Sequence, residues 1–211
     1  MNKPVLLIGG GGHARVLMDI LILSGAEVIG VLDPGFAQGT QLWRGVEVLG
    51  GDERLSDYDP STVDLVNALG YLPGKMARNQ LFAKLSSQGY CFPTLVHPHA
   101  VLSDDISLGE GCQIMAGAIL QPGCVIGANT IVNTRAVIEH DCVVGPDNHI
   151  APGAVLCGGV QTENGVFVGS HATVLPQVRI GVNALIGAGA VAAKDIPSNG
   201  KLAPPKSSLL S

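Results

Sequence analysis

The sequence has few aromatic and few charged residues. Phe, Trp and Tyr make up 4% of the 211 residues, and Asp, Glu, Lys and Arg make up 14%. There is no basic surplus, because 12 Lys and Arg stand against 17 Asp and Glu, which gives a formal net charge of -5. A general nucleic-acid-binding protein needs a basic face that neutralises phosphates. The composition therefore argues against a nucleic-acid partner and leaves small anionic ligands open.

The sequence also lacks paired cysteines and a long apolar run near its start. None of the five cysteines lies in a Cys-x-x-Cys pair, so neither a disulfide framework nor a zinc ribbon is indicated. Met1 to Pro4 lead directly into the short apolar segment Val5–Ile8, which glycines follow. This segment is too short for a signal-peptide core or a membrane span. We expect reduced thiols, no membrane span and a cytoplasmic location.

Glycine is abundant, at 29 residues, and the second half of the chain carries a six-residue period. Every sixth residue from Leu102 to Ala192 is Leu, Ile or Val, except Thr162 and Ala192. A mostly small residue lies two positions before each of them. Residues two apart share one face of a strand, so both columns are predicted to point inward. The aliphatic column is Leu102, Leu108, Ile114, Leu120, Ile126, Val132, Ile138, Val144, Ile150, Leu156, Thr162, Val168, Val174, Ile180, Ile186 and Ala192.

These repeats resemble the hexapeptide-repeat acyltransferase superfamily over about residues 100 to 195. The resemblance implies a left-handed parallel β-helix in which three hexads form one triangular coil, so that residues 18 apart stack. On one side of the prism, the outward positions then form a mostly apolar ladder. Such a ladder is typical of an interface, and we expect a homotrimer, as the resemblance also implies. The ladder consists of Val101, Ile119, Val137, Val155, Thr173 and Val191.

The first half of the chain predicts a small Rossmann-like α/β domain. A strand at Val5–Ile8, a glycine turn, a helix at residues 14–24 and a strand at Val28–Leu32 form a βαβ unit that ends at Asp33. Further strands are expected at residues 46–49 and 63–68, and a helix at residues 75–87. Gly-x-Gly-x-x-Ala at the first turn, with an acid about twenty residues later, is the dinucleotide-fold fingerprint.

The glycine turn is predicted to bind the pyrophosphate of a nucleotide sugar, because backbone N–H groups at a helix start bind phosphates. Two other interpretations stay open. The turn could be purely structural, and the domain could bind NAD, although about ninety residues is short for an NAD-dependent oxidoreductase. The predicted substrate-binding residues here are Gly10, Gly11, Gly12, His13 and Asp33.

We expect three parts: a nucleotide-sugar-binding domain at residues 1–93, a β-helix acetyltransferase domain at residues 94–196 and a tail at residues 197–211. The turn Gly9–Arg15, the linker Thr94–Ala100 and the segment Val132–Cys142 together resemble the family of sialic acid O-acetyltransferases and bacillosamine-pathway N-acetyltransferases. The match covers nearly the whole chain. It implies acetyl-CoA as co-substrate and no metal.

By this resemblance, His140 is the general base and Asp141 its partner. A neutral imidazole accepts a proton near physiological pH, and a carboxylate on the other ring nitrogen orients the ring. Gly158 lies one coil beyond His140, where its N–H could bind the oxyanion. Asn133 matches a sugar-contacting position, and His149 is predicted to contact substrate or CoA across the trimer interface.

The resemblance also predicts the CoA groove, with Gly187 and Ala188 allowing close backbone approach and Lys194 supplying charge. The family tail commonly ends in Gly-x-Pro-Ala-basic, whereas residues 200–206 read Gly-Lys-Leu-Ala-Pro-Pro-Lys, so the adenine contacts stay open. Two further alternatives are an acyl-enzyme on Cys157 and a zinc site. The zinc site would use His97, His99 and His171, but the usual His-x-x-x-x-His spacing is absent.

The sequence thus predicts an acetyl-CoA-dependent N-acetyltransferase that acts on a nucleotide-linked 4-amino-4,6-dideoxy sugar, with UDP favoured. A free sialic acid would have no pyrophosphate for the glycine turn. The alternatives are a sialic acid or other sugar O-acetyltransferase, and a non-catalytic trimeric module that binds a nucleotide sugar.

Overall fold

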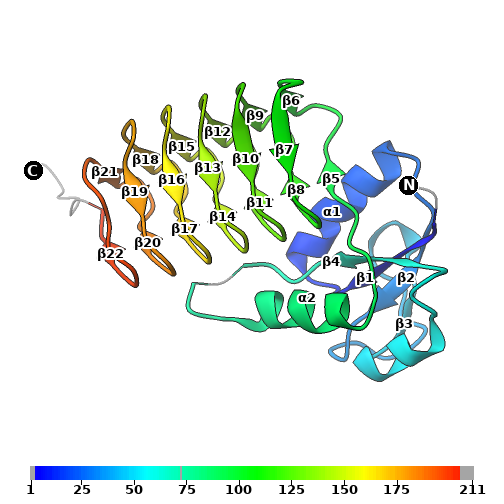
Figure 1. Ribbon diagram of the computed structural model, residues 1–211. Coiled ribbons are helices and arrows are strands. Elements are labelled where there is room, and N and C mark those ends of the chain that lie inside the picture. Colours follow the sequence, from blue (N-terminus) through cyan, green and yellow to red (C-terminus); the bar gives the residue numbers. More distant parts are fainter. Residues whose placement is uncertain (1–2, 72, 205–211) are drawn as a thin grey trace, which may run out of the picture. The chain divides into compact units, whose positions relative to one another are not determined.

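The chain divides after Pro98 into two units, Met1–Pro98 and His99–Ser211. The structure is a computed structural model that describes residues 3–71 and 73–204 (Figure 1). Within those ranges, no helix has both the length and the apolar character needed to cross a membrane. Residues 205–211 of the predicted tail lie outside the described ranges.

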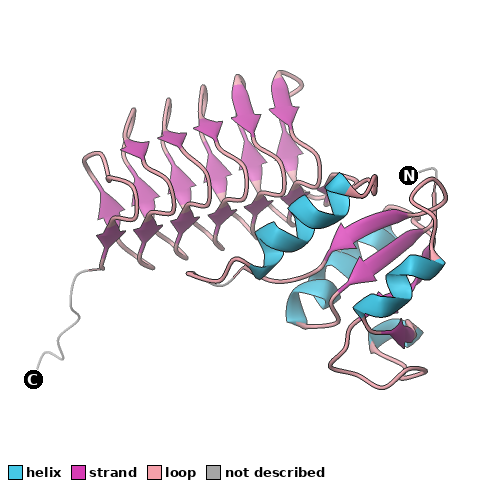
Figure 2. Ribbon diagram, turned by 60° about the horizontal axis from the view of Figure 1, so that its bottom comes forward, coloured by secondary structure: helices cyan, strands magenta, loops and turns pink. Residues whose placement is uncertain are grey.

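The first unit contains a four-stranded, fully parallel sheet in the order β3-β2-β1-β4. Helices lie on both sides of this sheet (Figure 2). The predicted strands Val5–Ile8 and Val28–Leu32 and both predicted helices are confirmed, with helix ends shifted by one or two residues. Two 3-10 helices were not predicted. The elements are β1 (Val5–Ile8), α1 (Gly12–Leu23), β2 (Val28–Leu32), η1 (Trp43–Gly45), β3 (Val48–Gly50), η2 (Asp52–Asp57), β4 (Asp64–Asn67), α2 (Ala77–Ser87) and β5 (Leu95–Val96).

One face of this sheet builds a hydrophobic core with η2 and α2. Leu6 and Ile8 point to the same side of β1, since strand residues two apart share a face. They pack with Leu55 of η2 and Leu85 of α2. The Tyr90 hydroxyl donates to the carbonyl oxygens of residues 55 and 58 at 3.1 and 2.8 Å, which ties the end of η2 to the segment that follows α2.

The second unit is a parallel β-helix whose three faces are sheets of short stacked strands (Figure 1). The first face contains β6 (Val101–Leu102), β9 (Ile119–Leu120), β12 (Val137–Ile138), β15 (Val155–Leu156), β18 (Thr173–Val174) and β21 (Val191–Ala192). The second contains β7 (Ile106–Leu108), β10 (Cys124–Ile126), β13 (Val143–Val144), β16 (Gln161–Thr162) and β19 (Arg179–Ile180). The third contains β8 (Gln113–Ile114), β11 (Ile131–Val132), β14 (His149–Ile150), β17 (Phe167–Val168), β20 (Leu185–Ile186) and β22 (Lys201–Leu202).

The predicted 18-residue register is confirmed, because Val137 pairs with Val155 and Val155 with Thr173. The aliphatic column is buried from Ile114 to Ala192. The small column is buried too, and Cys124 and Cys142 are free thiols within it. Their S–H groups donate to backbone carbonyl oxygens at 3.1 and 3.2 Å. The described start of the predicted tail is part of the β-helix, since β22 pairs with β20.

The corners of the β-helix follow a rule that the sequence analysis did not identify. Every sixth residue from Gly111 to Gly189 has a positive φ. Seven of these positions are glycine and the others are Asn129, Arg135, Asp141, Asp147, His171, Gln177 and Asn183. Asn and Asp tolerate the left-handed conformation better than most residues. Asp141 is therefore at a position where the corner itself favours Gly, Asn or Asp.

Candidate active site

His140 and Asp141 form a hydrogen-bonded pair at the corner that follows β12. His140 Nδ1 lies 2.8 Å from Asp141 Oδ2. The two side chains are 65% and 75% exposed, so solvent reaches the pair in the single chain. A carboxylate on Nδ1 favours the tautomer in which Nε2 is an acceptor. The pair thus has the geometry of an oriented general base.

Two glycines leave space for this pair: Gly158 on the next coil, 18 residues after His140, and Gly123 on the preceding coil, 18 residues before Asp141. A Cβ at Gly158 would lie 2.6 Å from Nε2 and 2.7 Å from Cε1 of His140. A Cβ at Gly123 would lie 2.6 Å from Oδ1 of Asp141. Real Cβ atoms essentially never approach so closely. The imidazole and the carboxylate therefore lie in positions that only glycine leaves open.

The Gly158 N–H is also the predicted oxyanion donor, and it belongs to the residue whose Cβ position adjoins the His140 imidazole. The neighbouring amide of Gly159 donates to the His140 carbonyl oxygen at 2.9 Å, and the Gly158 carbonyl oxygen accepts the N–H of Gln177 at 3.0 Å. Within the described residues, the Gly158 N–H makes no hydrogen bond. It is thus able to donate to a ligand.

Asn133 and His149 form a second pair, which the sequence analysis did not predict. Asn133 Nδ2 lies 3.2 Å from His149 Nε2, and Asn133 Oδ1 accepts the N–H of Thr134 at 2.7 Å. His149 is 8% exposed, and its ring packs edge-on against Phe167 with centroids 5.3 Å apart. Asn133 precedes β12, whereas His140 follows it. Asn133 and the His140–Asp141 pair therefore lie at the two corners that flank the first face, and His149 reaches Asn133 from β14 of the third face.

The predicted CoA-binding residues lie farther along these same two corners. Gly187 is three 18-residue steps beyond Asn133, and Lys194 is three beyond His140. At the strand spacing of the coil this separation is about 14 Å. A Cβ at Gly187 would lie 2.7 Å from Pro204 Cδ, so the chain's own Pro204 also requires glycine there. Lys194 is exposed and follows Ala188 and the last strand of the first face.

In the first unit, Asp33 organises the glycine turn. Its Oδ2 accepts the Gly10 N–H and its Oδ1 accepts the Gly35 N–H, both at 2.7 Å. Helix α1 begins at Gly12, directly after this turn. A Cβ at Gly11 or Gly12 would meet nothing within 4 Å. Packing inside the chain therefore does not explain these two glycines, and the helix N-terminus there is open to a ligand.

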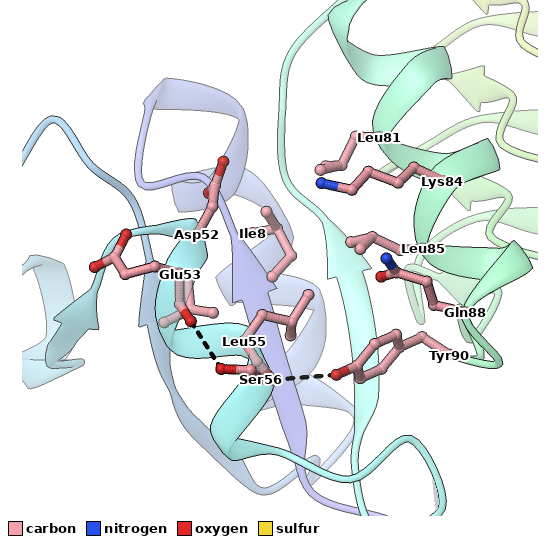
Figure 3. Close-up of a pocket in the computed structure, with 11 residues that line it drawn as sticks. Ile8, Asp52, Glu53, Leu55, Ser56, Leu81, Lys84, Leu85, Gln88 and Tyr90 are labelled. Carbon is pink, nitrogen blue, oxygen red and sulfur yellow. Dashed lines mark hydrogen bonds between the residues drawn. The ribbon is translucent and has the colours of Figure 1, made fainter.

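Two adjoining hollows extend from the turn along the carboxyl ends of β1 and β2. One, of about 190 Å³, touches Gly9, Asp33 and Leu69. The other, of about 220 Å³, lies between η2 and α2 (Figure 3), where Leu81 and Lys84 reach from α2 toward Ile8. Both hollows share an apolar floor with Asp52 at the edge. The shared residues are Ile8, Leu32, Asp52 and Leu81.

The residues of the alternative chemistries belong to both units of the chain. His97 Nε2 lies 3.8 Å from Asp19 Oδ2 within the first unit, whereas the His171 ring stacks over Gly153 in the β-helix. In residues 3–71 and 73–204, no group of three or more His, Cys, Asp or Glu side chains is arranged to hold a metal ion. Cys157 is half-buried, one residue before Gly158.

The repeated coil, its acid–histidine corner and the preceding α/β unit define a hexapeptide-repeat acyltransferase. The PglD N-terminal domain family matches residues 4–85. The hexapeptide repeat of bacterial transferases matches residues 105–138 and 123–158. These matches cover both units separately.

PerB from Caulobacter crescentus, solved in complex with CoA and GDP-perosamine, is 34% identical with a TM-score of 0.86 over 95% of this chain and 94% of that chain. The acetyltransferase domain of PglB from Neisseria gonorrhoeae FA1090, solved with acetyl coenzyme A, is 31% identical with a TM-score of 0.86 over 95% and 96% of the two chains. The chain belongs to the acetyltransferase family that includes these proteins. The predicted family, and with it the left-handed β-helix, is confirmed.

The UDP-N-acetylbacillosamine N-acetyltransferase of Bacillus subtilis (strain 168) is 33% identical over 117 residues. Those residues are 54% of this chain and 52% of that protein, so the match spans about half the length of this curated relative.

Proposed function

We propose that the chain transfers the acetyl group of acetyl-CoA to the amino group of a nucleotide-linked 4-amino-4,6-dideoxy sugar. The observation that carries the proposal is the His140–Asp141 pair held over Gly158, in a chain that aligns over 95% of its length with a sugar N-acetyltransferase. The amine is the nucleophile, and direct attack on the thioester needs only a base and an oxyanion donor.

In the proposed mechanism, Asp141 keeps the proton on Nδ1 of His140, so that Nε2 is free to take a proton from the attacking amine. As the C–N bond forms, the Gly158 N–H donates to the thioester oxygen, which becomes negative. When the tetrahedral species collapses, the C–S bond breaks and CoA leaves as the thiol once it has received a proton from the His140 imidazolium. Asp141 stabilises that imidazolium in the interval.

The nucleotide of the acceptor is assigned to the first unit. The diphosphate binds at the open start of α1, at Gly11 and Gly12, and the nucleoside occupies the adjoining hollows, where the apolar floor suits a planar base. This placement of the nucleotide follows the general rule that parallel α/β sheets bind ligands at the carboxyl ends of their strands. Asp33 acts chiefly by holding Gly10, since both of its oxygens already accept backbone N–H groups.

A homotrimer completes the site in this proposal. Val101 and Val191 of the outward ladder on the first face are 61% and 57% exposed, and apolar ladders of this kind favour burial against another copy. The first face lies between the Asn133 and His140 corners. A neighbouring prism would therefore cover the exposed pair and form a groove for CoA that leads toward Lys194. The five free cysteines fit a reducing compartment such as the cytoplasm.

The test is an acceptor screen with acetyl-CoA. UDP-, dTDP- and GDP-linked 4-amino-4,6-dideoxy sugars are offered beside free and CMP-linked sialic acid, and CoA release and product mass are followed. We expect an acetyl mass increment on at least one amino sugar. Efficient acetylation of only the sialic acids would instead assign an O-acetyltransferase. Binding of a nucleotide sugar by calorimetry without CoA release above background would leave a binding module.

A further inference from the structure

Arg78 is a buried cation that the proposed chemistry does not use. It is 2% exposed, although arginine is rarely buried without partners. Its Nη1 donates to the carbonyl oxygens of Asn67 and Leu69, both at 2.8 Å. In return, Asn67 Nδ2 donates to the Arg78 carbonyl oxygen at 3.0 Å. The side chain thus joins the end of β4 and the loop after it to the start of α2.

This location is an unfavourable one for a cation that serves stability alone. Arg78 is the second residue of α2, near the positive end of the helix dipole, where anions are favoured. Burial of a guanidinium adds a desolvation cost. The two carbonyl contacts to the loop after β4 are therefore made at an electrostatic cost.

The loop that Arg78 holds forms one wall of the glycine turn. A Cβ at Gly9 would lie 3.0 Å from Leu69 Cδ2 and 3.4 Å from the Leu69 backbone nitrogen. Likewise, a Cβ at Gly70 would lie 3.5 Å from His13 Cβ. Leu69 also lines the hollow that begins at Gly9. Displacement of this loop would therefore move the surface against which the turn is packed.

We propose that Arg78 is a positioning residue for the nucleoside diphosphate. Its two hydrogen bonds hold the loop after β4 against Gly9 and His13, at the turn where the diphosphate is proposed to bind. Arg78 contacts no substrate and acts through Leu69 and the turn. The inference rests on the proposed function and assigns the nucleotide sugar, not acetyl-CoA, as the substrate that depends on this residue.

The experiment compares Arg78→Met, Arg78→Gln and Arg78→Lys with Arg54→Met. The control removes the same charge from an exposed residue of the same unit, which pairs with Asp57 at 3.0 Å. Steady-state kinetics give kcat and both KM values, calorimetry measures the binding of UDP and GDP, and thermal unfolding checks the fold. The glutamine amide is uncharged and ends two bonds short of Nη1, whereas lysine keeps the charge and its donors and ends one bond short.

We expect Arg78→Met to raise the KM for the nucleotide sugar at least tenfold, with kcat and the KM for acetyl-CoA changed less than threefold. Arg78→Lys should recover most of the loss and Arg78→Gln less, and Arg54→Met should match wild type. Equal changes in both KM values, or wild-type nucleotide affinity in all three Arg78 variants, would overturn the inference. If Arg78→Met does not fold, the lysine and glutamine variants decide. If wild type acetylates none of the sugars, the proposed function fails, and calorimetry still tests Arg78.

Discussion

Replacement of Gly158 by alanine tests the link between the stacked coils and the chemistry. The backbone of Gly158 does not have a positive φ, so alanine fits the local conformation. The new Cβ, however, would lie 2.6 Å from His140 Nε2, whereas ordinary contacts begin at 3.4 Å. The imidazole must therefore move away by about 0.8 Å, which is the difference between 3.4 and 2.6 Å, to reach an ordinary contact distance.

A displacement of this size should lower kcat about 10²-fold, because a misplacement of about 1 Å costs on that order. This loss corresponds to about 2.7 kcal/mol of transition-state stabilisation. The measurement is steady-state kinetics at saturating acetyl-CoA and acceptor, together with a thermal unfolding curve. We expect the curve to stay close to that of wild type, since the clash involves one exposed side chain that can rotate away.

Gly165→Ala is the matched control. Its Cβ would clash in the same way with Asn183, one coil further, but at a different corner of the prism and with a φ of +70°. It should therefore harm stability more than Gly158→Ala does and leave kcat close to wild type. Retention of a third or more of the wild-type kcat by a folded Gly158→Ala protein would refute the idea that the imidazole must lie over this glycine.

Four further substitutions test the proposal and the stability of the β-helix. His140→Ala should lower kcat about 10²-fold or more with CoA affinity by calorimetry unchanged, and Asp141→Asn should cost less; a fully active His140 variant would require another base. Val137→Glu should give monomers in light scattering and abolish turnover, and a variant that stays trimeric would mean that another face forms the interface. Burial raises the pKa of the Cys142 thiol from 9.0 to about 12. The unfolded thiol releases its proton first as pH rises, so this contribution to stability is complete below pH 9 and is lost between pH 9 and 12. In Cys142→Ala, the urea midpoint of unfolding should fall less steeply with pH between pH 9 and 12 than in wild type. An unchanged pH dependence would contradict this role of the Cys142 thiol.

The repeat was readable from the sequence because each coil position is chemically simple. Inward positions such as Ile138 and Ala136 must fill a narrow core, so their type recurs every six residues. The glycines directly after the aliphatic column, such as Gly109 and Gly169, do not have a positive φ. A Cβ at Gly109 or Gly169 would lie 2.5 Å from a backbone nitrogen of the next coil. Close approach of the next coil, not a special φ, requires glycine there.

Side-chain contacts between residues far apart in the sequence were harder to predict. The period predicted that Gly158 stacks on His140, because the spacing is one full coil. The bond between Asn133 and His149 has a spacing of 16 residues instead of a full coil, and it depends on side-chain rotamers on two successive coils. The role of Arg78 was likewise hidden, since one arginine in a helix carries no pattern. The column of left-handed corners could have been found, as it recurs from Gly111 to Gly189.

The uniform 18-residue register fixes the distances between residues along the axis of the β-helix. His140 and Lys194 lie on the same corner of the prism, three coils apart. The separation is a whole number of coils because no residue is inserted between Val137 and Ala192. Loss or gain of one coil would preserve every inward and outward position yet change that length by about 4.8 Å. The distance between these two positions can therefore change only by whole coils. In the proposed groove, a cofactor of different length would be fitted by adding or removing coils and not by reshaping a pocket.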